Sequence, residues 1–447
     1  MSSLTLAIII AFVIGYVCIA LESVIHINKA AIALLMMVAC WVLFMMDPGA
    51  YIPDLSGDAL YAHVNHQLQV HLGDTGTTLF FLMGAMTIVE IIDQHGGFNF
   101  VRNALNTTHK RRLLWSIAFM TFFLSAILDN LTTSIVMIMV LHKLVDQRAD
   151  RLIYASAVVL AANSGGAFSP IGDVTTIMLW NASFITAAGV IMEIFIPSLV
   201  SMVVPVFLLQ YTLHGSLEHD DDFGPVEQEN ELTGRERKAI FFLGVGGLIF
   251  VPIFRYLTNL PPFVGILMVL GLMWLTTEIF YAHLPKQSGG DTMQKRVSNL
   301  LSRIDMGTIL FFLGILMAVA CLEEVGVLTA MGRWLNDVSG GNHYLVTSAI
   351  GIISSLVDNV PLVAGCMGMY PLAPTGDMAV DGIFWQLLAY CAGVGGSMLI
   401  IGSAAGVVVM GLEKVTFGWY LRRITPIAFI GYIVGIICYW VLRTFIF

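Results

Sequence analysis

Long apolar stretches recur along the chain, and each is long enough to cross a hydrocarbon core of about 30 Å as a helix. The ordinary ones lie near 4–21, 30–46, 75–93, 189–213, 239–258, 263–283, 306–325 and 425–443. The first of them lacks a basic leading region and a clear cleavage site, so we expect a membrane span there and not a signal peptide. This pattern predicts an all-α polytopic membrane protein.

Four further apolar segments are interrupted by polar residues near their centres. Residues 113–144 and 344–370 each contain an Asp-Asn pair, in "ILDNLTT" and "LVDNVPL". Residues 152–182 and 384–412 are each interrupted by glycine-rich sequence, "NSGGAFSPIGDVTT" and "GVGGSMLIIGSAAG". Irregular backbone at membrane depth is tolerated only where it is buried in protein or lines a cavity. The four segments are therefore expected to form the functional core.

Segment 113–144 has a length that fits neither one span nor two. As a single helix it would be about 48 Å long, at about 1.5 Å per residue. Its flanks, 110–112 and 143–151, are both basic. A re-entrant hairpin that turns at Asp129-Asn130 explains both facts, whereas a bent single span would leave one basic flank outside. We predict hairpins at 113–144 and, from the opposite side, at 344–370, and full but broken spans at 152–182 and 384–412.

The distribution of basic residues supports this topology. It places 18 of the 21 Lys and Arg residues, Lys29 among them, in cytoplasmic loops and leaves only Arg255, Arg333 and Arg443 outside. An excess of Lys and Arg in cytoplasmic loops is the usual rule for membrane proteins.

The two halves of the chain resemble each other at a nearly constant offset. "TLFFLMGAM" from residue 78 matches "ILFFLGILM" from residue 309, and the two Asp-Asn pairs are 229 positions apart. Each half is expected to have five spans, one of them broken, and one hairpin, which gives ten spans plus two hairpins. Because five crossings is an odd number, the second repeat (239–447) is inverted relative to the first (1–213), and an acidic cytoplasmic linker (214–238) joins them. Inverted repeats with discontinuous helices are typical of secondary transporters.

Composition narrows the class further. The chain of 447 residues is 57% hydrophobic and 11% charged, against about 25% charged residues in soluble domains. The net charge of −9 argues against nucleic acid partners, and the six cysteines lie in apolar segments at unrelated spacings. No phosphate-binding loop, Cys-x-x-Cys or His-Glu-x-x-His motif occurs. The sequence therefore predicts a transporter and not an enzyme, with no cofactor and with the lipid bilayer as its surroundings.

Candidate ligands in the four core segments are oxygen atoms. The carboxylates are Asp129, Asp173 and Asp358, and no Lys or Arg lies near the centre of these segments. The hydroxyl and amide side chains are Asn130, Thr132, Thr133, Asn163, Ser164, Thr175 and Thr176 in the first half and Ser354, Asn359, Ser397 and Ser403 in the second. Oxygen ligands suit a hard cation such as Na⁺ or Li⁺. Since Asp173 aligns with Ser403, the principal site is expected in the first half.

The segments "SAILDNLTTSIVM", "ANSGGAFSPIGDVTTIMLW" and "SSLVDNVPLVA" resemble the signature segments of the NhaD-type Na⁺/H⁺ antiporters of the ion transporter superfamily. The resemblance covers essentially the whole chain. It implies efflux of sodium or lithium driven by proton entry, and a location in the plasma (inner) membrane of a bacterium. It also implies a homodimer of scaffold and transport domains with an elevator-like movement.

Other interpretations stay open at this point. Asp129 and Asp358 can serve as turn caps, and Asp173 can cap a half-helix. A superfamily member that carries another ion is one alternative function. An intramembrane aspartyl protease is another, although Pro170 replaces the first glycine of its Gly-x-Gly-Asp motif.

Several ionisable residues at the ends of spans are candidates for an ion path or a pH response. These are Glu90, Asp93, His95, Glu323 and Glu324. A plain interfacial carboxylate, or a plain loop histidine at position 95, is the competing interpretation. We expect His63, His66 and His71 of "HVNHQLQVH" to lie in an exposed outer loop and not to bind a metal.

Overall fold

The computed structural model describes residues 3–20, 27–96, 109–213, 232–282, 297–356 and 358–446, with isolated positions between them. The long regular elements in these ranges are all α-helices, so the predicted all-α class is confirmed. Most of the acidic linker predicted at 214–238 lies outside the described residues, and the repeat boundaries stay a prediction.

Helices occupy every ordinary span that the sequence predicts. They are α1 (Ser3–Ala20), α3 (Lys29–Met46), α4 (Asp58–Gln94), α10 (Ala187–Leu209), α11 (Gly234–Thr258), α12 (Pro262–Ala282), α15 (Met306–Glu324) and α22 (Thr425–Phe445). Eight described helices are long and apolar enough to cross a membrane: all of these except α1, together with α6 (Lys110–Leu128). The chain is a multi-pass membrane protein.

The four interrupted segments each fold as two helices with a break between them. The two expected hairpins are α6 with α7 (Asn130–Leu144), and α17 (His343–Ser354) with α18 (Asn359–Met369). The two broken spans are α8 (Arg148–Ala167) with α9 (Val174–Asn181), and α19 (Ile383–Gly395) with α20 (Ala404–Glu413). The predicted breaks are therefore present in both halves.

Polar side chains cap the helix that follows each break. Asp129 accepts a hydrogen bond from the backbone N–H of Thr132 and starts α7, and Asp358 starts α18. Asp173 and Ser403 cap α9 and α20 in the same way. Each cap satisfies a backbone N–H that has no partner within its helix. Capping therefore accounts for part of the role of all three aspartates.

Equivalent contacts hold each hairpin against its broken helix. The hydroxyl of Ser125 on α6 donates to the carbonyl oxygen of Ala162 on α8, 2.6 Å away. In the second half, the hydroxyl of Ser354 on α17 donates to the carbonyl oxygen of Ala392 on α19, 2.9 Å away. The two halves thus repeat the same packing, in agreement with the offset in the sequence.

Two glycines make this packing close. A Cβ on Gly165 would lie 2.1 Å from the carbonyl oxygen of Phe122, and a Cβ on Gly395 would lie 2.2 Å from that of Gly351. No side chain larger than hydrogen fits at either position. The atoms that a Cβ would meet belong to the backbone, and backbone atoms cannot move aside as the end of a flexible side chain can. The glycine-rich motifs therefore bring hairpin and broken helix into backbone contact.

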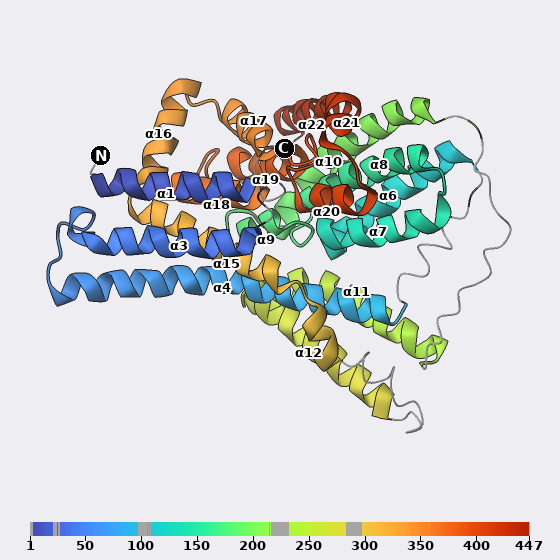
Figure 1. The fold of residues 1–447 in the computed structure, drawn as a ribbon, viewed down its shortest axis with the longest axis horizontal. Coiled ribbons are helices and arrows are strands. Elements are labelled where there is room, and N and C mark those ends of the chain that lie inside the picture. Colours follow the sequence, from blue (N-terminus) through green and yellow to red (C-terminus); the bar gives the residue numbers. More distant parts are fainter. Residues whose placement is uncertain are drawn as a thin grey trace.

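The helices form two groups that each draw on both halves of the chain (Figure 1). One group contains α1, α3, α4, α11, α12 and α15. The other contains α6 to α10, α17, α19, α20 and α22, and within it α10 packs against α22 and α8 packs against α19. The hairpin helix α18 contacts α15 of the first group and both α9 and α19 of the second. The interrupted helices thus gather in the second group, and α18 reaches the first.

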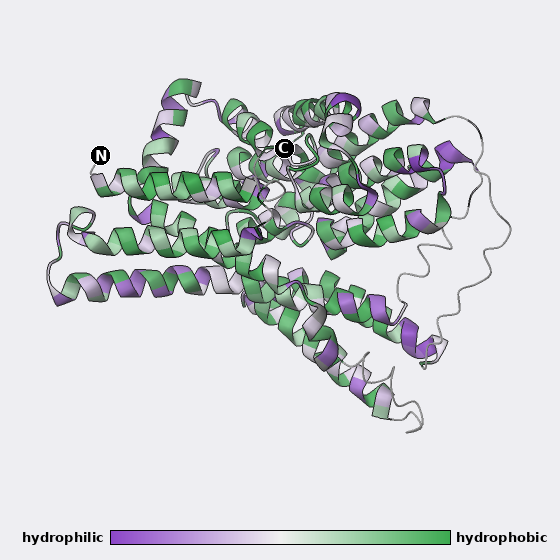
Figure 2. Ribbon diagram, in the orientation of Figure 1, coloured by the Kyte–Doolittle hydropathy of each residue, from purple (hydrophilic) through white to green (hydrophobic). Residues whose placement is uncertain are grey.

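Helix α4 is longer than the predicted span at 75–93, because it begins at Asp58. Figure 2 shows that its N-terminal half is largely hydrophilic. No glycine or proline occurs between Asp58 and Leu72, and the buried side chains of Leu60 and Val64 lie on one face. The expectation of an outer loop around His63 to His71 is therefore wrong, since helix continues through a polar stretch whose apolar residues recur every four positions.

Some short helices were not predicted. They are α16 (Val327–Ser339), α21 (Phe417–Arg423), α14 (Val297–Leu300), and the 3₁₀ turns η1 (Pro48–Ala50), η2 (Gln210–Thr212) and η3 (Leu301–Arg303). Helix α16 buries Leu328 and Gly332 and exposes Trp334. The pattern of long apolar stretches does not predict α16, because this helix is amphipathic and too short to span a bilayer.

Candidate functional site

Asp173 lies at the centre of a buried polar network and is only 1% exposed. Its carboxylate accepts hydrogen bonds from the side-chain amide of Asn130 at 2.8 Å and from that of Asn359 at 3.2 and 3.3 Å. The backbone N–H of Thr175 donates to the same carboxylate at 3.0 Å. Three elements therefore meet at this side chain: the tips of both hairpins and the break in α8–α9.

Asn163 extends the network to the second broken helix. Its side-chain oxygen accepts from the amide of Asn130 at 3.1 Å, and its own amide donates to the hydroxyl of Ser403 at 2.8 Å. Asn163 and Ser403 are almost completely buried. The network thus joins residues from all four interrupted segments.

The donors around Asp173 are neutral. Among the described residues, no Lys, Arg or His forms an ion pair with its carboxylate. An ionised carboxylate in such a buried position is costly unless a cation or a proton compensates its charge. The arrangement can therefore hold a small cation or a proton, and the amide donors position the carboxylate for either.

Asp129 lies beside this network at the tip of the first hairpin. Its two carboxylate oxygens accept from the backbone N–H and the hydroxyl of Thr132, at 2.7 and 2.9 Å. The backbone of Asp129 has φ 86° and ψ 158°, a region that residues other than glycine rarely adopt, so the hairpin tip is strained there. The hydroxyls of Thr133 and Thr175 are buried, with no hydrogen-bond partner in the described part of the chain. Two hydroxyl oxygens are therefore available at the hairpin tip and at the break.

Four predicted ligands make other contacts. The hydroxyl of Ser164 is 3.0 Å from that of Ser201 on α10. Thr176 and Ser397 donate to the backbone carbonyl oxygens of Asp173 and Val394. The hydroxyl of Ser354 is used in the contact with α19 described above. These side chains join helices or cap them, and the structure does not bring them into the network.

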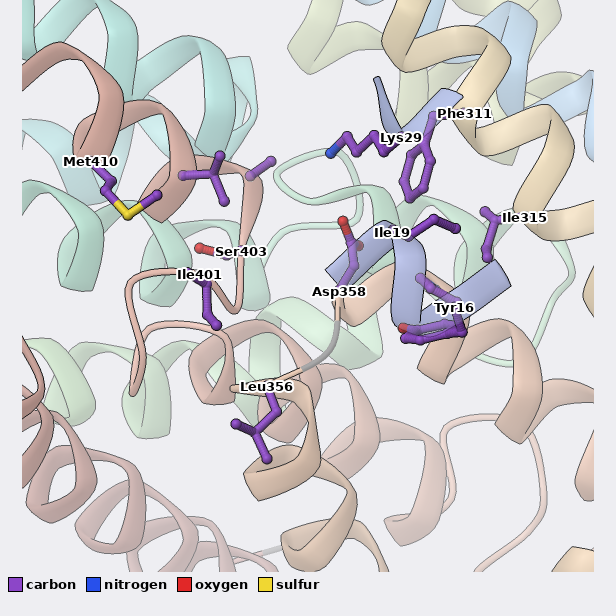
Figure 3. A pocket seen from close by; sticks show the side chains of 13 residues that line it. Tyr16, Ile19, Lys29, Phe311, Ile315, Leu356, Asp358, Ile401, Ser403 and Met410 are labelled. Carbon is purple, nitrogen blue, oxygen red and sulfur yellow. The ribbon is translucent and has the colours of Figure 1, made fainter. Parts of the chain in front are cut away.

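Asp358 has a different environment from Asp173. It is partly buried and lines a cavity between the two groups of helices, together with Tyr16, Lys29 and Ser403 (Figure 3). The sequence predicts Lys29 in a cytoplasmic loop, and the four core segments have no Lys or Arg near their centres. Lys29 is the first residue of α3 and brings a positive charge to the cavity from outside the four core segments.

The candidates at the end of α4 differ in their exposure. Glu90 accepts from the side chain of Gln94 at 3.1 Å, and both Glu90 and Asp93 are partly exposed. His95 is buried, with its Nδ1 2.6 Å from the carbonyl oxygen of Ile91 and its Nε2 2.8 Å from the hydroxyl of Tyr281. His95 is therefore not a plain loop histidine, since it ends α4 and joins it to α12.

The carboxylates at the end of α15 lie near the polar part of α4. His71 Nε2 is 2.9 Å from a carboxylate oxygen of Glu324, and Glu323 is exposed. Local sequence patterns do not predict this pair, because its members are 253 positions apart. In the described part of the chain, no group of three or more His, Cys, Asp or Glu residues is arranged to hold a resident metal ion.

Comparisons with known proteins agree with this architecture. Residues 16–389 match the profile of a family described as citrate transporters. A solved structure of the YdaH transporter from Alcanivorax borkumensis is similar with a TM-score of 0.55 and 14% identity, over 88% of this chain and 90% of that one. This likeness supports the fold.

Relatives at higher identity are antiporters by name. "Sodium/proton antiporter 2" of Arabidopsis thaliana is 42% identical over 97% of this chain and 99% of its own length. "Sodium/proton antiporter 1" of the same plant is 44% identical over 97% of this chain and 72% of its own length. "Na(+)/H(+) antiporter NhaD" of Alkalimonas amylolytica is 31% identical over 95% and 88%. The chain is thus a transporter and belongs to the NhaD-type antiporter family of the ion transporter superfamily.

Proposed function

We propose that this protein exchanges cytoplasmic Na⁺ or Li⁺ for protons across a membrane. One observation carries the proposal: the carboxylate of Asp173 is buried at the meeting point of both hairpins, and its hydrogen-bond donors in the described ranges are all neutral N–H groups. A site of this kind can take either a small hard cation or a proton. The names of the relatives support the same pair of ions.

The principal ion site is proposed in the first repeat. Asp173 and Asp129 supply the charge, and the hydroxyls of Thr132, Thr133 and Thr175 supply neutral oxygens. Asn130 and Asn359 hold the Asp173 carboxylate directly. Asn163 accepts from Asn130 and donates to Ser403, so these two residues support Asn130. Because Ser403 takes the position of Asp173 in the second repeat, that repeat contributes amide and hydroxyl groups but only the one carboxylate of Asp358.

Exchange follows from competition for the same carboxylates. A bound cation stabilises the charged form of a buried carboxyl group, and protonation removes the charge. Cytoplasmic Na⁺ displaces protons, and protons from the other side displace Na⁺. The empty site is charged, so its movement through the apolar layer costs more than that of the loaded or protonated site. This difference couples the two ions and limits leak.

The proposed movement is of elevator type. Helices α6 to α10 and α17 to α22 would form the transport domain, and α1, α3, α4, α11, α12 and α15 the scaffold of a homodimer. We propose the plasma (inner) membrane of a bacterium as its location, with the sodium-releasing face outside.

The function is tested by a transport assay on the purified protein in proteoliposomes with an interior pH dye. We expect Na⁺ and Li⁺ to drive proton movement and K⁺ to drive much less, because a small buried cage of oxygen atoms favours the smaller ions. Empty liposomes are the control. Exchange with K⁺ but not Na⁺ would support the alternative, a superfamily carrier for another ion, and no cation-driven proton movement would contradict antiport.

The proposed topology has its own test. We expect a cysteine in place of Glu227 in the acidic linker to react with a membrane-impermeant maleimide only from the cytoplasmic side, and one in place of Asn65 on α4 only from outside. The charge distribution of the loops is the reason. The parent protein is the control, because its six cysteines are buried or partly buried. Labelling of both variants from one side would contradict the inverted repeat.

A further inference from the structure

A cavity separates the second hairpin from the scaffold helices. Tyr16 on α1, Lys29 on α3 and Phe311 on α15 line one side of it, and Asp358 and Ser403 line the other. In Figure 3 the carboxylate of Asp358 and the ammonium end of Lys29 are turned toward the same space. Among the described residues that line it, the cavity therefore has one acidic and one basic group, on opposite sides of the boundary between the two groups of helices.

The cavity lies toward one end of the helices that line it. Tyr16 is in the last two turns of α1, Lys29 is the first residue of α3, and Phe311 is in the second turn of α15. Met410, which also lines the cavity, is in the last turn of α20. The proposed topology puts all four of these helix ends on the cytoplasmic side. The cavity is then the cytoplasmic approach to Asp358 and, past Ser403, to the network around Asp173.

Lys29 is held by the scaffold. It belongs to α3, which packs against α15 and α1, and its ammonium nitrogen lies 4.5 Å from the centre of the Phe311 ring. A cation over an aromatic face is attracted to it, and the contact fixes the position of the charge. Lys29 is only partly buried, so it can face ions that enter from the cytoplasm.

We propose that Lys29 is a tethered cation that competes with Na⁺ for Asp358 at the cytoplasmic entrance. This inference rests on the proposed function and adds a residue that sets its apparent ion affinity. Two cations near one carboxylate repel each other, and in a narrow protein cavity this repulsion is screened less than in bulk water. Lys29 therefore weakens Na⁺ entry and gives Asp358 a counter-charge when no ion is bound. It is a positioning residue, because it acts through Asp358.

The test measures Na⁺ binding and transport in Lys29→Gln. We expect its half-saturating Na⁺ concentration to fall at least about threefold, which corresponds to about 0.65 kcal/mol. Lys29→Arg keeps the charge and should stay close to the parent. Lys414→Gln is the matched control, because Lys414 is an exposed lysine on the same proposed side. Lys29→Met is a second uncharged variant that keeps apolar contact with Phe311.

A double-substitution cycle separates electrostatic competition from a structural effect. In an Asp358→Asn background, Lys29→Gln should no longer change the Na⁺ dependence, because the group for which the two cations compete is gone. Na⁺-dependent thermal stabilisation of the purified protein provides a readout that does not need transport. An unchanged Na⁺ dependence in Lys29→Gln, or an effect that persists without Asp358, would overturn the inference. If the parent itself neither binds Na⁺ nor moves protons, the proposed function fails instead.

Discussion

Replacing Asp173 by asparagine should reduce Na⁺-driven proton movement at least about 100-fold, equivalent to about 2.7 kcal/mol. Asparagine has nearly the same shape, and its side-chain oxygen can still accept from Asn130 or Asn359. It has neither the negative charge that attracts Na⁺ nor a site for the exchanged proton. The measurement is the initial rate of exchange in proteoliposomes across a range of Na⁺ concentrations.

Two further variants make this result interpretable. Asp337→Asn removes an exposed carboxylate on α16 and should leave exchange unchanged. Asp173→Ser makes the first repeat copy Ser403 of the second, and it should weaken the Na⁺ or Li⁺ dependence at least about tenfold. If Asp173→Asn keeps near-normal exchange, Asp173 is only the cap of α9, and Asp358 becomes the leading ion ligand.

Asp129→Asn should also abolish exchange while the protein stays folded. Asparagine has nearly the same shape as aspartate and meets the same backbone strain at this turn (φ 86°, ψ 158°), and its side-chain oxygen can still accept from the N–H of Thr132. The substitution therefore keeps the hairpin tip and removes its charge. Exchange rate and melting temperature should be measured together, with exchange lost and the melting temperature shifted by only a few degrees.

The equivalent position in the second repeat provides the comparison. Asp358→Asn alters the same kind of cap at the start of α18, outside the network around Asp173, and it should retain measurable exchange. Equal loss in both variants would contradict a principal site in the first repeat. Normal exchange in Asp129→Asn would reduce Asp129 to a turn residue.

The residues of the proposed ion site could be predicted from the sequence only in part. Asp129, Asn130, Asp173 and Asn359 were predicted as neighbours because each interrupts an apolar run, and a buried polar group needs a partner. The sequence could not say which of the neighbouring polar residues face the site. Asn163 and Ser164 are adjacent on α8, yet successive helical residues point about 100° apart, so Asn163 joins the network and Ser164 meets Ser201 on α10.

The sequence by itself determined the spans, the four breaks and the two-fold repeat, because apolar length, Asp-Asn turns and glycine-rich breaks act within a few residues of where they occur. Only the tertiary structure decided the contacts between distant segments. Asn359 donates to Asp173 across 186 positions, and His71 pairs with Glu324 on another helix. Lys29, assigned to the loop between the first two predicted spans, reaches the cavity at Asp358 because α3 packs against α15. The physical reason is that local pattern fixes where a helix starts and stops, whereas the rotation and packing of whole helices fix which side chains meet.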